Sequence, residues 1–399
     1  MPAKALSGGD PTLLRRLNTE AVLRSLRGAD PMTLTQIGKS AGLSRQTVDV
    51  VIEELAHGGW IEETAPEKSV GRPARRYRFR AENRHVLGID VGVDSASYAL
   101  SDLDGTLLAT SRAAMPARQT AAQRLAAVRD GAVDLLATQP TARLGALALG
   151  VPAVADARGR IRLSTPLPEW TGLDLAEGAS AWFGLPAYVE NDANLAALAE
   201  HWRGAARGAS DFIQLIAGRR SGAGMMLGGR LHRGRGGAAG EIGALPLLGW
   251  ESAAMNDIRN AADPARIFAD AQAGDIEATA MVDRFARVVA QGLAAMVLTV
   301  NPDLVVIGGG LSRAGEGAAA PIRAHLGRLC LDPPDVAVSE LGTEAVSLGA
   351  VRLALEHLNA DLFGTLGAAT YSPLPTQDRA PRPAVQNTLS ADLVTRTEV

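Results

Sequence analysis

A run of polar side chains near the N-terminus has the residue types that read base edges in DNA. Ser44, Arg45, Gln46, Thr47 and Asp49 occur together at the start of a predicted helix, which Ser44 can cap. Arginine suits guanine, glutamine suits adenine, and threonine can contact a phosphate or a thymine methyl group. Asp49 repels phosphate unless it accepts from cytosine N4 or pairs with Arg45. This pattern is typical of the N-terminal turn of a recognition helix.

A second cationic segment follows at the distance expected of a wing. Residues 60–63 and 77–79 predict two strands of a hairpin, and the loop between them contains glycine and proline. Six arginines lie between Ser69 and Arg84, against one acid, Glu82. An extended arginine loop of this kind can enter a narrow minor groove or clamp phosphates. We predict that three of its side chains contact DNA: Arg72, Arg75 and Arg76.

Three short helices must hold these side chains in place. The third helix is predicted to bury one face, because apolar residues recur at helical spacing: Val48, Val51, Ile52 and Leu55. Gly42 permits the sharp turn before it. The second helix carries a capping box formed by Thr33 and Gln36. The first helix is predicted to begin at a cap on Asn18 or Thr19.

Such a turn also occurs in three-helix units that do not bind DNA, so the turn alone leaves both interpretations open. The basic wing favours DNA binding. Residues 1–84 contain 14 Lys and Arg against 10 Asp and Glu, whereas the remainder contains 26 against 33. A basic head on an acidic body fits a nucleic-acid-binding domain joined to one that does not bind nucleic acid.

The composition limits the classes of protein to which this chain can belong. The chain has 399 residues, of which 47% are hydrophobic and 21% charged, as in a globular protein of two or three domains. The single cysteine, Cys330, excludes an internal disulfide and a cysteine-rich zinc site. No apolar run is long enough to span a bilayer and no export signal is recognised, so a cytoplasmic location without membrane contact is predicted.

The body contains two similar units. Residues 86–92 predict a buried strand ending in Asp-x-Gly, followed by strands near 97–100 and 107–109. The pattern recurs with a strand at 212–216, a glycine-containing turn at 218–224 and a strand at 225–227. Two such units at the heads of two α/β halves predict a duplicated, actin-like architecture with a cleft between lobes.

We predict four segments from these patterns. Residues 1–82 form a winged helix-turn-helix domain. Residues 85–189 with 344–358 form the first actin-like lobe, and residues 190–343 form the second. Residues 366–399 mix Pro, Thr, Ser, Gln and Arg with few core residues, and are predicted to be disordered.

Four motifs in this order resemble the ROK family of sugar kinases and transcriptional repressors. They occupy residues 88–92 (GIDVG), 189–194 (VENDAN), 237–243 (GAAGEIG) and 301–310 (NPDLVVIGGG). The leading winged helix resembles the repressor branch. The resemblance implies an α/β fold of the actin-like, or ribonuclease H-like, sugar-kinase type. It also implies a sugar site in the cleft and a homodimer or homotetramer.

The resemblance also implies roles for three cleft residues. Asp192 stands where the kinases have the general base for the sugar hydroxyl. Asn191 would orient the sugar, and Glu241 would accept hydrogen bonds from sugar hydroxyls. Asn191 and Asp192 can instead cap the helix predicted at 195–202, and Glu241 can be an ordinary loop carboxylate. A cap fixes its side chain, so the two roles can coexist.

The phosphate loops depart from the kinase pattern. The family has Asp-x-Gly-Gly-Thr in the first loop, whereas this chain has Asp90, Gly92 and then Asp94, whose charge would repel phosphate. The family has Gly-Thr-Gly-x-Gly in the second loop, whereas Arg219 and Arg220 follow Gly218 here. These arginines would fill nucleotide space, or would bind an anion such as a phosphorylated sugar. We therefore predict no catalysis and regard Asp192 as a vestigial base.

The zinc loop of the family has no counterpart here. Ala244 follows the Gly-Glu-Ile-Gly motif, and residues 245–250 contain neither Cys nor His. Zinc requires about four nitrogen or sulfur ligands, so we predict that the protein binds no metal and no cofactor. Glu251 is a candidate replacement for one lost sugar contact.

These features predict a sequence-specific regulator of sugar metabolism, more typical of a repressor than of an activator. Its predicted partners are a double-stranded DNA operator and a sugar or sugar-phosphate effector, with the degenerate kinase domain as sensor and oligomerisation module. One alternative is an ATP-dependent ROK sugar kinase with an accessory DNA-binding head. Another is an oligomeric regulator whose cleft binds nothing.

Overall fold

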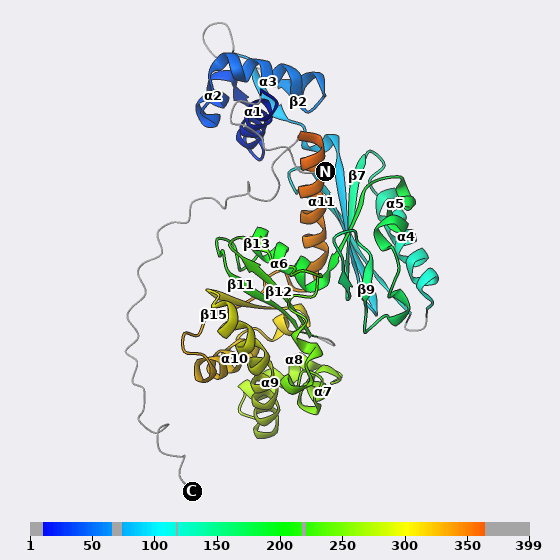
Figure 1. Ribbon diagram of the computed structural model, residues 1–399, viewed down its shortest axis with the longest axis vertical. Coiled ribbons are helices and arrows are strands. Elements are labelled where there is room, and N and C mark those ends of the chain that lie inside the picture. Colours follow the sequence, from blue (N-terminus) through cyan, green and yellow to red (C-terminus); the bar gives the residue numbers. More distant parts are fainter. Residues whose placement is uncertain (1–10, 66–73, 117–118, 218–220, 364–399) are drawn as a thin grey trace.

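A computed structural model describes residues 11–65, 74–116, 119–217 and 221–363 of the chain. Figure 1 shows a small helical head above two larger lobes, with one long helix between the head and the lobes. Among the described residues, no helix combines the length and the apolar character that crossing a bilayer requires. Arg72, Gly218, Arg219, Arg220 and the 366–399 tail lie outside the described residues.

The head contains three helices and a three-stranded sheet of order β1-β3-β2. Its predicted third-helix stripe is buried, and the capping box on Thr33 and the cap on Ser44 are confirmed. The first helix begins at Pro11, so the predicted start at Asn18 or Thr19 is wrong; those residues lie inside the helix. The elements are α1 (Pro11–Leu26), β1 (Met32–Thr33), α2 (Leu34–Ala41), α3 (Arg45–His57), β2 (Ile61–Thr64) and β3 (Arg76–Phe79).

The first lobe is built on a five-stranded sheet of order β10-β7-β4-β5-β6. The three strands β4, β5 and β6 are antiparallel neighbours, and β7 and β10 extend the sheet in parallel with β4. The strands are β4 (His85–Val91), β5 (Ser95–Asp102), β6 (Leu107–Ala114), β7 (Leu144–Val151) and β10 (Ala187–Asn191), with helices α4 (Ala121–Ala137) and α5 (Leu175–Phe183). A short hairpin of β8 (Val154–Ala155) and β9 (Ile161–Leu163) lies beside them.

The second lobe repeats this topology, with the order β13-β12-β11-β14-β15. Again three antiparallel strands are followed by two parallel ones, so the predicted duplication is confirmed. The strands are β11 (Phe212–Ala217), β12 (Ser221–Leu227), β13 (Arg230–Leu231), β14 (Leu304–Gly308) and β15 (Asp335–Val338). The helices of this lobe are α7 (Ala253–Arg259), α8 (Pro264–Gln272), α9 (Ile276–Val300) and α10 (Glu316–Leu329).

Two helices are packed between the sheets. Helix α11 (Ala345–Phe363) covers one face of the first sheet, and α6 (Asp192–Arg203) covers one face of the second. Their backbones touch, because a Cβ at Gly349 would come within 1.9 Å of the Leu195 carbonyl oxygen. Only glycine permits this approach. The two lobes therefore share a continuous buried layer.

Several predicted boundaries differ from the observed elements. Strand β12 begins at Ser221, inside the segment predicted as a turn. Strand β10 runs to Asn191 and crosses the predicted lobe boundary at 189/190, and α11 extends past residue 358 to Phe363. The glycines at 222 and 224 led to the prediction of a turn at 218–224. Glycine also occurs inside paired strands where another backbone approaches closely.

The head is fixed to the body through the C-terminal end of α11. Phe363 makes edge-on ring contacts with Trp60 and Phe79, at centroid distances of 5.2 and 6.1 Å. The guanidinium of Arg27 lies over Phe79 and Phe363, and it donates to Asn359 Oδ1 at 2.7 Å. One hydrophobic core therefore continues from the head helices into α11 and α6.

Replacing Phe363 with alanine should release the head from the body. Truncation of a buried phenylalanine costs about 3–5 kcal/mol, and here the loss falls on the junction. In calorimetry, we expect the variant to show a separate unfolding transition of the head at a lower temperature than the main transition. The parent chain should show a single transition. Leu331→Ala is the control, because that side chain is 91% exposed; a single unchanged transition in Phe363→Ala would contradict this assignment.

Candidate nucleic-acid interface and effector cleft

The start of α3 presents the predicted reading residues to solvent. Arg45, Gln46 and Asp49 are exposed, and Val48 between them is fully buried. The Ser44 side chain accepts from the Thr47 backbone N–H at 3.2 Å, and the two hydroxyl oxygens lie 2.8 Å apart. The cap thereby orients the first turn, where a recognition helix meets base edges.

An apolar side chain on the same surface was not predicted from the sequence. Val50 is 53% exposed although it lies between buried positions of α3. An exposed valine next to Arg45, Gln46 and Asp49 has the chemistry to contact a thymine methyl group. The helical period places position 50 outside the buried stripe, so a helical wheel already contains this signal.

The three predicted wing arginines have different surroundings. Arg75 is 70% exposed at its side chain, and its Nη1 lies 3.6 Å from Glu63 Oε2. Arg76 Nη1 donates to the Pro31 carbonyl oxygen at 3.2 Å, which ties β3 to the segment before β1. Arg72 lies outside the described residues. The structure thus gives Arg76 a role in holding the hairpin, whereas Arg75 is available at the surface.

The count of six arginines overstates the free positive charge of the wing. Arg78 forms hydrogen bonds with Glu62 at 2.7 Å and with Glu82 at 2.7 Å, and Arg80 lies 3.4 Å from Glu62. The Arg78 hydrogen bond lowers the pKa of the Glu82 carboxyl, which keeps the carboxylate charged. Glu62 comes from the opposite strand, so this neutralisation could not be counted within the loop.

Asn191 and Glu241 meet in the cleft. The Asn191 side-chain oxygen accepts from the backbone N–H groups of Ala193 and Asn194, at 2.9 and 3.2 Å, so the predicted cap of α6 is confirmed. Its Nδ2 donates to the Ala153 carbonyl oxygen at 3.3 Å and to Glu241 Oε1 at 3.5 Å. Glu241 is exposed, yet desolvation by the protein around it raises the pKa of its carboxyl. The cap and a cleft ligand contact are geometrically compatible.

Asp192 faces a second carboxylate. Burial raises the pKa of Asp90 to about 7, and the negative charge of Asp192 contributes further. Arg112 opposes this shift, because its positive charge favours the ionised carboxylate. The sequence did not predict Arg112, since the strand recognised at 107–109 ends before it. Cross-strand pairing supplies the link: Asp90 pairs with Ser97, and Ser97 pairs with Arg112.

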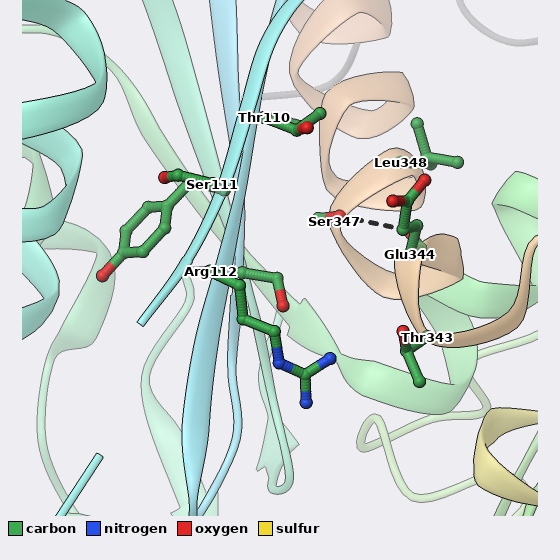
Figure 2. A pocket seen from close by; sticks show the side chains of 10 residues that line it. Thr110, Ser111, Arg112, Thr343, Glu344, Ser347 and Leu348 are labelled. Carbon is green, nitrogen blue, oxygen red and sulfur yellow. Dashed lines mark hydrogen bonds between the residues drawn. The ribbon is translucent and has the colours of Figure 1, made fainter. Parts of the chain in front are cut away.

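Arg112 lines a cavity of about 190 Å³ between the first sheet and the start of α11. Figure 2 shows its guanidinium extending past the edge strand toward the segment that carries Thr343. Its Nη2 donates to Ser95 Oγ at 2.9 Å, and Ser347 Oγ on the opposite wall donates to the Glu344 carbonyl oxygen at 3.0 Å. Arg112 therefore both lines this cavity and acts electrostatically on Asp90.

A buried arginine forms hydrogen bonds with the turn that follows Asp90. The Gly92 N–H donates to the Ser95 carbonyl oxygen at 2.9 Å, and Asp94 is exposed. Arg124 of α4 is 1% exposed and donates to the carbonyl oxygens of Gly92 and Val93, at 3.2 and 2.7 Å. The Gly92 amide, in the loop that corresponds to the first phosphate loop of the kinases, is thus already hydrogen-bonded.

The segment after Glu241 forms two short 3₁₀ turns. Ile242–Ala244 and Pro246–Leu248 precede α7. Glu251 is 79% exposed at its side chain, and its Oε1 lies 3.5 Å from Arg259 Nη1. Across the ranges that the structure covers, no group of three or more His, Cys, Asp or Glu side chains is arranged to hold a metal ion.

Comparison with known proteins places this geometry in a family. The ROK family model matches residues 86–251 and 249–357. A xylose repressor of Caldicellulosiruptor bescii is 27% identical over 393 residues, which cover 88% of this chain and 98% of the repressor. The solved structure of a ROK family transcriptional regulator, a homologue of Escherichia coli Mlc, has a TM-score of 0.72 and 20% identity, covering 88% of this chain and 98% of that one.

A kinase matches a smaller share of the chain. The ROK hexokinase of Thermus thermophilus is 30% identical with a TM-score of 0.57, and the match covers 69% of this chain and 99% of the hexokinase. The two lobes thus have the ROK sugar-kinase fold, and the regulator's structure also spans the head. Because the family model matches most of the chain, with both lobes inside the matched ranges, the chain belongs to the ROK family.

Proposed function

We propose that this protein is a sequence-specific DNA-binding regulator of sugar metabolism, acting as a repressor in the cytoplasm. The observation that carries this proposal is the capped, solvent-facing start of α3 on a head that shares one core with a ROK body. The similarity to a xylose repressor over 88% of the chain supports it. Two copies of the head, in a homodimer or homotetramer, would grip two half-sites of a palindromic operator.

The effector proposed for the cleft is a sugar or a sugar phosphate. Asn191 is held rigidly by its cap, and Glu241 and Asp192 offer carboxylate oxygens to sugar hydroxyls. A sugar there would bridge residues of both lobes. It would alter DNA affinity only through different affinities for two lobe arrangements, and the α6–α11 layer is the physical link to the head.

Two features support a body without kinase activity. The Gly92 amide is bonded to the Ser95 carbonyl oxygen, and Asp94 adds a negative charge beside the turn. Phosphoryl transfer needs free backbone donors and Mg²⁺ around the phosphates. We also propose that the protein functions without zinc, which elemental analysis of the purified chain tests.

The alternative is a sugar kinase with a DNA-binding head, and the retained Asp90 and Asp192 carboxylates favour it. An ATP-turnover assay across pentoses and hexoses, beside an active ROK hexokinase, separates the two. We expect no sugar-dependent formation of ADP. Sustained turnover by the full chain, lost in Asp192→Asn, would replace the regulator proposal with the kinase.

Substituting Arg45 with alanine should weaken and broaden operator recognition. Loss of one bidentate base contact costs about 1–3 kcal/mol and relaxes preference at one base pair. Selection of bound sequences from a random DNA pool, followed by affinity measurement, shows both effects. Arg328→Ala, an exposed arginine on the second lobe, is the control; the same base preference in Arg45→Ala and the parent would refute the reading role.

We expect the wing arginines to have two different roles, which are contact with DNA and support of the hairpin. Arg72→Ala with Arg75→Ala should weaken binding to all sequences alike and reduce the salt dependence by about 0.9 per lost phosphate contact. Arg76→Ala should instead lower the melting temperature of the head, because it removes the bond to Pro31. Fluorescence anisotropy at several salt concentrations and calorimetry measure the two effects. Unchanged DNA affinity when all three arginines are alanine would exclude a role for the wing.

Asp90 should make stability depend on pH. Its pKa of about 7 in the folded protein exceeds the ordinary aspartate pKa of 3.8, so ionisation destabilises the fold as pH rises from about 4 through 7. Asp90→Asn lacks this charge and should be more stable than the parent at pH 8, with the difference falling at pH 5. Urea unfolding at both pH values measures it, with the exposed Asp332→Asn as control. An equal difference at both pH values would show that Asp90 is not buried as described.

A further inference from the structure

A larger cavity lies outside the interlobe cleft, at the free edge of the first sheet. Its volume is about 510 Å³. The walls come from the β8–β9 hairpin region at 155–162, the edge strand β10, the loop at 233–237 and two residues of α11, Leu353 and His357. Asn191, Asp192 and Glu241 are not among its lining residues. It is therefore a separate concavity from the sugar cleft.

The cavity is cationic. Four arginines line it against two carboxylates, Asp156 and Glu190, so its side chains carry an excess of two positive charges: Arg158, Arg162, Arg233 and Arg235. Both carboxylates are already engaged. Glu190 pairs with Arg233, and Asp156 accepts the backbone N–H groups of Arg158 and Arg160, at 2.9 and 3.1 Å.

Two of the guanidinium groups are available to a ligand. Arg162 Nη1 donates to the Gly236 carbonyl oxygen at 3.1 Å, which joins the hairpin to the opposite loop. No hydrogen bond or ion pair to another described residue is found for the side chains of Arg158 and Arg235. Converging arginines on one concavity, without a full set of acidic partners, are the usual means of recognising phosphate.

A flat wall adjoins the arginines. The rings of Tyr188 and His357 stack at a centroid distance of 3.9 Å and an interplanar angle of 10°. This pair belongs to β10 and α11, and both residues line the cavity. A ligand with a phosphate at one end and a ring or carbon skeleton at the other would find a complementary surface for each part.

We propose that this pocket binds a phosphorylated small molecule and is a second effector site. A phosphomonoester carries a charge of about −1.5 to −2 at pH 7, which matches the excess positive charge. Arg158 and Arg235 contact the phosphate, and the Tyr188–His357 wall contacts the remainder of the molecule.

The regulatory part of this proposal rests on the proposed function. His357 lines the pocket, and Asn359 and Phe363 on the same helix hold the head. Phe363 lies six positions after His357 on the helix, a rise of about 9 Å. A displacement of α11 caused by a bound ligand would therefore reach the head over less than two turns of helix.

Calorimetric titration of the full chain with inorganic phosphate tests the pocket, at constant ionic strength so that screening does not change. We expect saturable binding of one phosphate per chain, weakened at least fivefold in Arg158→Ala with Arg235→Ala. Arg207→Ala with Arg328→Ala removes the same charge at exposed sites elsewhere and should bind as the parent does. No binding by the parent, or equal binding by the Arg158/Arg235 variant, would overturn the proposal.

Two phosphorylated probes identify the carrier of the phosphate. Glucose 6-phosphate and AMP are titrated beside phosphate, and the one that binds more tightly indicates a sugar or a nucleotide. Operator affinity is then measured with and without that probe. We expect a change of at least threefold in the parent and none in the Arg158/Arg235 variant. An operator affinity that the probe does not change in the parent would overturn the regulatory role. Failure of the parent to bind DNA without any probe would instead contradict the proposed function, and the calorimetric evidence for the pocket would still hold.

Discussion

The close contact between α6 and α11 is the constraint on which the rest of the structure depends. Gly349 allows the two backbones to touch, which places both helices in one layer between the sheets. The N-terminus of α6 carries Asn191 and Asp192, and the C-terminus of α11 carries Phe363. Because interiors are close-packed, a change of lobe angle at one end of this layer must be accommodated along it, toward the head.

The head combines exposed reading groups with a substantial internal ion-pair network. Arg78 and Arg80 are held by Glu62 and Glu82, and Arg76 holds the segment before β1. Surface ion pairs contribute little stability individually, but several sharing the same partners fix the orientation of the hairpin. The described part of the hairpin is thus supported by these contacts, and the Arg75 side chain is 70% exposed on it.

Hydrogen bonds made on folding fix both Asn191, in the proposed effector cleft, and the turn at Gly92. Asn191 is oriented by the cap that starts α6, so its position is maintained by folding itself. The turn at Gly92 is likewise maintained, but by bonds that occupy its amide and carbonyl groups. The arginine-lined pocket that we propose as a second effector site also includes residues of α11, Leu353 and His357.

The sequence by itself determined the local features: the Thr33 and Ser44 caps, the buried stripe of α3, the Asn191 cap and the duplicated strand pattern. Each is set by residues within a few positions of one another, where periodicity and capping chemistry act. Only the tertiary structure decided which arginines are neutralised, that Arg112 lies beside Asp90, and that Phe363 closes the head. Those outcomes depend on strand register and on contacts between segments far apart in the chain, because charge and burial are properties of the assembled surface.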